Sequence, residues 1–90
     1  MDHLPESGIL QLFYGRALAG VGKLKEAQAS LEKAAEILPE SVDAHLNLGV
    51  VYWKLGEQEK ARKSWQRVLE IEPRNEQALG YLRRKGQEEK

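Results

Sequence analysis

The chain has 90 residues, in which 14 Lys and Arg are balanced by 14 Asp and Glu, and it contains no Cys. This length allows one compact domain, and a formal charge of zero provides no net attraction for nucleic acid or an anionic membrane. The missing cysteines exclude a disulfide framework and a thiolate metal site and point to a cytoplasmic location. Because no run of ~18 apolar residues and no basic-then-apolar start is present, we expect neither a membrane span nor a secretion signal.

Residues 8–41 align with residues 42–75 without a gap, at a constant offset of 34 residues. The alignment pairs identical residues: Gly15 with Gly49, Gly22 with Gly56, Ala27 with Ala61, Ile37 with Ile71 and Pro39 with Pro73. Since chance rarely preserves one offset without insertions, the sequence predicts two copies of one structural unit.

Five helices are predicted in chain order, over residues 8–20, 24–38, 42–55, 58–71 and 76–86. The apolar residues of the second and fourth recur at the spacing of one helix face, and the residues between them are polar. Gly22 and Gly56 favour a tight turn inside each unit, while Pro39 and Pro73 end its second helix. Asn75, like Ser41 one unit earlier, is suited to cap the helix that follows.

The second unit carries Leu48-Gly49-x-x-Tyr52, followed by Gly56, Ala61, Trp65, Val68 and Pro73. This pattern resembles the tetratricopeptide repeat, and the first unit keeps it more loosely. The resemblance implies an all-α fold, a right-handed superhelical α-solenoid fragment of helix-turn-helix repeats. It divides residues 8–86 into repeat 1 (8–41), repeat 2 (42–75) and a capping helix (76–86), with flexible ends at 1–7 and 87–90.

No constellation of residues predicts catalysis, a metal site or a bound cofactor. His3 and His45 do not have the spacing of metal ligands, and no serine lies in a nucleophile elbow. Arg83, Arg84 and Lys85 could bind phosphate or an acidic peptide, but cations in the last turn also complement the helix dipole. We therefore expect a protein that is not an enzyme and needs no cofactor.

Trp65 belongs to the apolar stripe of the fourth helix and is predicted to be core, at the junction with the closing helix. Trp53 differs, because the third helix is apolar nearly all round and one side of it cannot be covered by its neighbours. In the family this side resembles the concave wall that binds partners. The predicted groove consists of Ile9, Leu12, Arg16, Asp43, Leu46, Asn47, Val50, Trp53, Lys54 and Arg84.

The resemblance also allows a comparison with family members that hold acidic chaperone tails in a carboxylate clamp. The clamp positions correspond to Leu12, Arg16, Asn47, Gly80 and Arg84, of which only Asn47 and Arg84 match in type. Both clamp lysines are missing, so this specificity is not expected. Asn47 is instead expected to bond backbone between helices.

These patterns favour a scaffold, adaptor or co-chaperone-like module that binds an apolar segment of a partner protein in the concave groove. The alternative is structural self-association, or membership of a longer array, through the groove or through the outer side of the first helix around Leu10, Tyr14 and Ala17. Nucleic-acid binding is not expected, because the charge is balanced and no basic track is present.

Overall fold

A computed structural model describes residues 7–88, which form five α-helices: α1 (Gly8–Gly20), α2 (Leu24–Ile37), α3 (Val42–Lys54), α4 (Gln58–Ile71) and α5 (Glu76–Glu88). Within this range no strand is present. The all-α prediction is confirmed, and each helix begins where the sequence predicts. Two of the predicted flexible ends are shorter than expected: Ser7 caps α1, and α5 continues two residues beyond residue 86. The remaining residues of these ends, 1–6 and 89–90, lie outside the described part.

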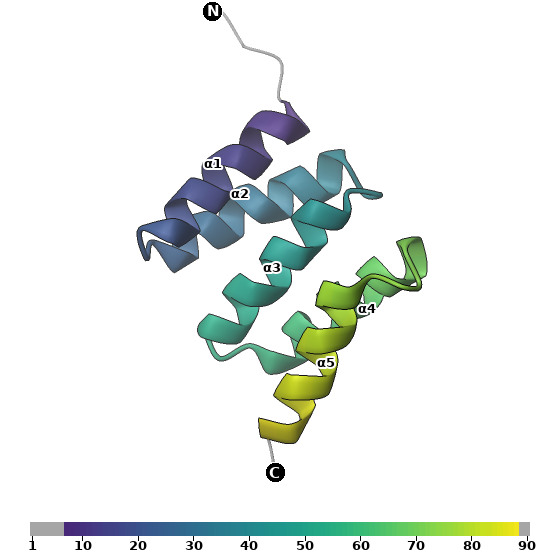
Figure 1. Ribbon diagram of the computed structural model, residues 1–90. Coiled ribbons are helices and arrows are strands. Elements are labelled where there is room, and N and C mark those ends of the chain that lie inside the picture. Colours follow the sequence, from purple (N-terminus) through teal and green to yellow (C-terminus); the bar gives the residue numbers. More distant parts are fainter. Residues whose placement is uncertain (1–6, 89–90) are drawn as a thin grey trace, which may run out of the picture.

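The helices form two antiparallel hairpins, α1–α2 and α3–α4, and α5 packs against the second (Figure 1). Helix α3 lies between the first hairpin and α5 in this arrangement, and it contacts both α1 and α2. The molecule is elongated, with extents of 52 × 27 × 17 Å, because each hairpin packs beside the previous one and does not fold back over it.

The turn inside each hairpin has the same geometry in both units. Gly22 and Gly56 both have a φ of 86°, in the left-handed region that side chains other than glycine rarely adopt. The next amides donate back to Leu18 O at 2.9 Å and to Tyr52 O at 2.8 Å, which closes a Schellman motif at the end of each first helix. The glycines therefore fix where each hairpin reverses.

The helix caps agree with the prediction. Ser41 Oγ accepts from Ala44 N at 3.1 Å, and Asn75 Oδ1 accepts from Ala78 N at 2.9 Å. Each cap satisfies an amide that the first turn of a helix leaves without a partner.

The core runs along the length of the molecule and is thin. Its buried apolar residues are Leu12, Leu18, Ala27, Leu31, Ala34, Ala44, Leu46, Leu48, Val51, Tyr52, Ala61, Trp65, Val68 and Ala78. Trp65 is fully buried, as predicted, and it lies against Gly49, where an added Cβ would come within 2.6 Å of the indole Cδ1. In the first hairpin Gly15 meets Leu31 in the same way, so close helix approach depends on glycine in both units.

Candidate partner-binding faces

A small recess lies between α3 and α5, with α4 beneath it. Val50, Trp53 and Lys54 contribute from α3, Tyr81 from α5 and the buried Trp65 from α4, around a volume of about 120 Å³. Trp65 stacks on Tyr81 with ring centroids 4.9 Å apart, and Trp53 lies 6.0 Å from Trp65 at a tilt of 34°. The recess is thus an aromatic hollow with one cation at its edge.

Packing, and not hydrogen bonding, sets the position of the indole beneath this recess. Trp65 Nε1 is buried, and among the described residues no acceptor receives a hydrogen bond from it. The ring is held between Gly49 on one side and Tyr81 on the other. Close packing against both neighbours restricts the orientations that the ring can take.

Most of the predicted groove residues are accessible in the structure. Ile9, Arg16, Asp43, Lys54 and Arg84 are exposed, while Asn47, Val50 and Trp53 are half-buried. The recess brings together Val50, Trp53 and Lys54.

Two of the predicted groove residues are core residues instead. Leu12 is only 4% exposed and Leu46 only 7%, so neither can anchor a partner from an open wall. The two residues occupy the same position in the repeat, and both join the continuous core cluster, because each helix packs against its neighbours on more than one side. The expectation that Leu12 and Leu46 line an open groove was wrong.

Asn47 does not bond between helices, contrary to expectation. Its Nδ2 donates to Asp43 O at 2.7 Å, one turn earlier in the same helix. The Asn47 side chain therefore makes a hydrogen bond within α3, and it remains partly accessible to solvent.

Phe13 and Tyr81 were missed as candidates. Phe13 is 56% exposed on α1, and Tyr81 is half-buried in the recess. Both lie 34 residues from Asn47, which is the offset of the repeat. They therefore occupy the same position in the repeat as a predicted groove residue, and the sequence alone could have identified them.

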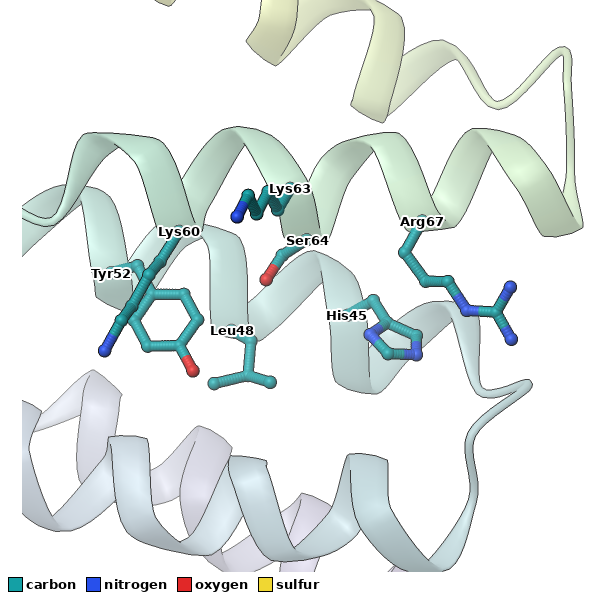
Figure 2. A pocket seen from close by; sticks show the side chains of 7 residues that line it. All are labelled: His45, Leu48, Tyr52, Lys60, Lys63, Ser64 and Arg67. Atoms are coloured by element: carbon teal, nitrogen blue, oxygen red, sulfur yellow. The ribbon is translucent and has the colours of Figure 1, made fainter.

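A second, wider hollow of about 370 Å³ is lined by side chains of α3 and α4 (Figure 2). Its cationic rim is Lys60, Lys63 and Arg67, and its other lining residues are His45, Leu48, Tyr52 and Ser64. Leu48 and Tyr52 at its floor are only 4% and 8% exposed, and three cations stand around them, so this hollow does not present an uncharged apolar surface.

Tyr52 spans this hollow as a strut between the two hairpins. Its hydroxyl donates to Glu32 Oε2 at 2.5 Å, and Lys60 Nζ lies 5.7 Å from its ring centroid. Burial, with the nearby Glu32 carboxylate, raises the pKa of the Tyr52 phenol well above its ordinary value. The hydroxyl therefore stays protonated, and keeps donating, to a higher pH than an ordinary tyrosine.

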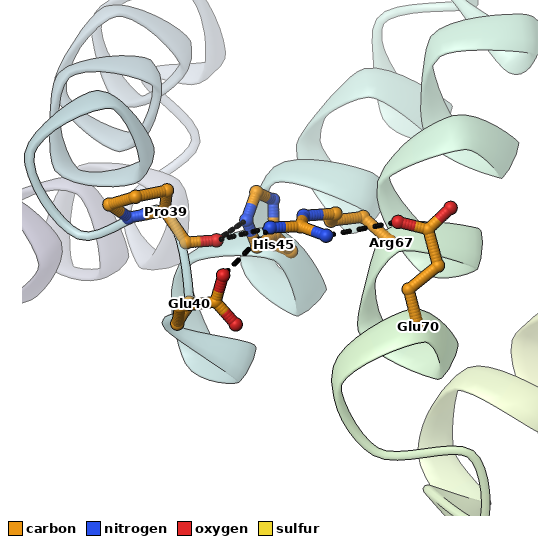
Figure 3. A network of polar contacts seen from close by, with 5 residues as sticks. All are labelled: Pro39, Glu40, His45, Arg67 and Glu70. Carbon is orange, nitrogen blue, oxygen red and sulfur yellow. Dashed lines mark hydrogen bonds and ion pairs between the residues drawn. The ribbon is translucent and has the colours of Figure 1, made fainter.

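A polar network closes the far end of the same hollow (Figure 3). Arg67 reaches Glu40 at 3.1 Å and Glu70 at 3.0 Å, while His45 Nε2 lies 2.9 Å from the Pro39 carbonyl. The hydrogen bond to Glu70, together with the charge of Glu40, raises the Arg67 pKa. These contacts tie the α2–α3 connection to α4, which gives His45 and Arg67 a structural role.

Among the described residues, no group of His, Asp and Glu side chains is arranged to hold a metal ion. In that same part of the chain, no helix is long and apolar enough to cross a membrane.

A family model described as tetratricopeptide repeat matches residues 18–85. The chain belongs to the tetratricopeptide repeat family. The predicted resemblance is thereby confirmed, and the family's general role is to mediate protein–protein interaction. In this tetratricopeptide repeat protein, small residues stand where the helices approach closely. They are Gly15, Gly49, Ala27 and Ala61.

The chain is also similar to a curated relative, Protein CTR9 homolog from Arabidopsis thaliana. The two are 31% identical over 65 residues, which make up 72% of this chain and 6% of the relative. This tetratricopeptide repeat chain therefore corresponds to a small part of that relative.

Proposed function

We propose that this chain is a binding module that takes up an apolar segment of a partner protein on its concave side, with no catalytic step and no cofactor. The division into repeat 1 (8–41), repeat 2 (42–75) and a capping helix (76–86) is part of this proposal, and so is a cytoplasmic location. The observation that carries it is the aromatic recess at Val50, Trp53 and Tyr81.

The recess suits one apolar side chain of a partner. Its walls are the partly exposed side chains of Val50, Trp53 and Tyr81, and the fully buried indole of Trp65 supports them from beneath. Partly exposed aromatic residues on a closely packed support are typical of interface anchors, because they bury a large area at little entropic cost. At the other end of the same side, Ile9 and Phe13 are 51% and 56% exposed and extend the apolar surface.

The charges around this surface favour acidic residues beside the apolar segment. Lys54 lines the recess, Arg16 is exposed on α1 and Arg84 is exposed on α5. Asp43 is exposed near the other end of α3 and favours a cationic residue there. Rim charges of this kind steer association more than they strengthen it.

A displayed peptide library with the intact chain as bait tests the proposal. Selected peptides should share an apolar residue flanked by acidic ones, and Trp53→Glu should weaken their binding by on the order of 2 kcal/mol, as for a central aromatic anchor. Lys25→Glu, on the exposed outer side of α2, is the matched control and should leave binding unchanged.

Two outcomes would contradict the proposal. If Trp53→Glu abolishes the helical circular dichroism signal, Trp53 is a core residue and cannot be an anchor. If the variant remains folded and binds the selected peptides as tightly as the intact chain, recognition uses another face.

Self-association through this groove, or membership of a longer array, is the alternative function. The structure offers a second surface for self-association on the outer side of α1, and Phe13 borders both surfaces.

A further inference from the structure

The side of α1 that faces away from α2 is apolar, and none of the described residues covers it. Leu10, Tyr14, Ala17 and Val21 lie along it at helical spacing, and we name them the α1 end face. Leu10 is 66% exposed, Tyr14 58% and Val21 71%, and Ala17 is exposed as well. Helix α1 lies at one end of the row of helices (Figure 1).

The equivalent positions in the second repeat indicate which kind of contact this face makes. At the offset of 34 residues, the α1 end face corresponds to Ala44, Leu48, Val51 and Leu55 on α3. There the first three are 0%, 4% and 1% exposed, because α3 packs on α2. The same positions are therefore buried where a neighbouring helix is present, so the α1 end face is a helix-packing surface that no helix within residues 7–88 covers.

We propose that a second copy of the chain covers this face, with the two α1 helices packed antiparallel about a two-fold axis. An axis midway between residues 15 and 16 places Tyr14 opposite Ala17 of the second copy, and Leu10 opposite Val21 of the second copy. Large side chains then face smaller ones along the whole stripe, which is how helix surfaces interdigitate. A two-fold interface uses one patch twice and must be complementary to itself, as this stripe is.

Charge does not oppose the pairing. Arg16 is the sole charged residue within Gly8–Gly20, and its position in the repeat is that of the recess residue Val50, away from the α1 end face. Antiparallel α1 helices also place opposite dipole ends side by side. The two copies carry no net charge that would repel them.

The area is sufficient for a weak dimer. Phe13 flanks the stripe and is 56% exposed. A fully exposed large apolar side chain presents ~200 Å². At their exposed fractions, Leu10, Phe13, Tyr14 and Val21 together offer on the order of 500 Å² per copy and ~1,000 Å² for the pair, which is the lower end for specific interfaces. Each copy presents a patch at the upper end of what monomers expose.

Sedimentation velocity over protein concentrations from roughly 1 µM to 1 mM, a range chosen for a weak complex, tests the proposal. The mass of the intact chain should approach that of two copies as concentration rises. Ala17→Glu places a carboxylate in the apolar interface and should weaken the dimer at least ~10-fold. Ala29→Glu, the same change on the exposed side of α2, should leave it intact.

The register has its own test, since the chain contains no cysteine. An equal mixture of Tyr14→Cys and Ala17→Cys variants should form disulfide-linked dimers faster than either variant alone. A monomer at every concentration, an Ala17→Glu dimer as stable as the intact one, or equal cross-linking in all three samples would overturn the proposal. Loss of the dimer in Trp53→Glu but not in Ala17→Glu would place self-association in the groove and would likewise overturn it.

Discussion

Two glycine-to-alanine substitutions inside helices should change stability in opposite directions. A Cβ on Gly49 would come within 2.6 Å of the Trp65 indole, whereas a Cβ on Gly80 would meet nothing closer than 3.9 Å, at the end of the Arg84 side chain. Both changes improve helix propensity by about 1 kcal/mol. At Gly80 nothing opposes that gain, so Gly80→Ala should stabilise the fold by up to about 1 kcal/mol.

At Gly49 the gain is outweighed by overpacking. Inserting a methyl group into a filled core costs about 1–3 kcal/mol, and the upper end applies because Trp65 is fully buried and stacked on Tyr81. Gly49→Ala should therefore lose about 2 kcal/mol net, which places the two variants about 3 kcal/mol apart. Because unfolding of a small single domain is usually two-state, urea titration followed by circular dichroism gives both values.

A second substitution identifies the cause of the loss. Trp65→Phe removes the pyrrole ring, which carries the indole atoms nearest Gly49. In that background Gly49→Ala should cost at least ~1 kcal/mol less than in the intact chain, as residues in direct contact are non-additive. If Gly49→Ala and Gly80→Ala have the same effect, or if the Trp65→Phe background changes nothing, close approach at Gly49 does not hold the helices together.

Other predictions concern the Tyr52 strut and ligands. The phenol pKa of Tyr52 is higher in the folded chain than its unfolded value of about 10, so its contribution to stability is present below pH 10 and is lost as the pH rises further. The intact chain should thus lose more stability than Tyr52→Phe between pH 9 and pH 11, measured by urea titration, and parallel losses would contradict this. Zinc, magnesium and nucleotides should leave the melting temperature unchanged, since a ligand that binds the folded state must raise it; a saturable rise would reopen the question of catalysis.

The helices could be predicted because their signals are local. Gly22 and Gly56 mark the turns, Ser41 and Asn75 the caps, and each acts within a few residues of its own position. The fixed offset of the repeat then carried the prediction for one hairpin to the other.

The accessible face could be predicted less well. Helix α3 is apolar nearly all round, so periodicity alone does not decide which residues its neighbours cover, and Leu46 was placed on the wrong side. Exposure also depends on where the row of helices stops: Leu48 is buried, while Tyr14 at the same position in the repeat is exposed. The offset from Asn47 could have pointed to Tyr81, but which of these positions is open depends on tertiary packing.

The arrangement of the hairpins in a row has a consequence for how the chain folds. The main helix contacts join elements that are adjacent or nearly adjacent in sequence, α1 with α2, α2 with α3, α3 with α4 and α4 with α5. Such a chain closes only short loops on the way to its native state, which predicts fast folding. It also has little to couple its two ends, so a force applied at the termini should release one hairpin before the other.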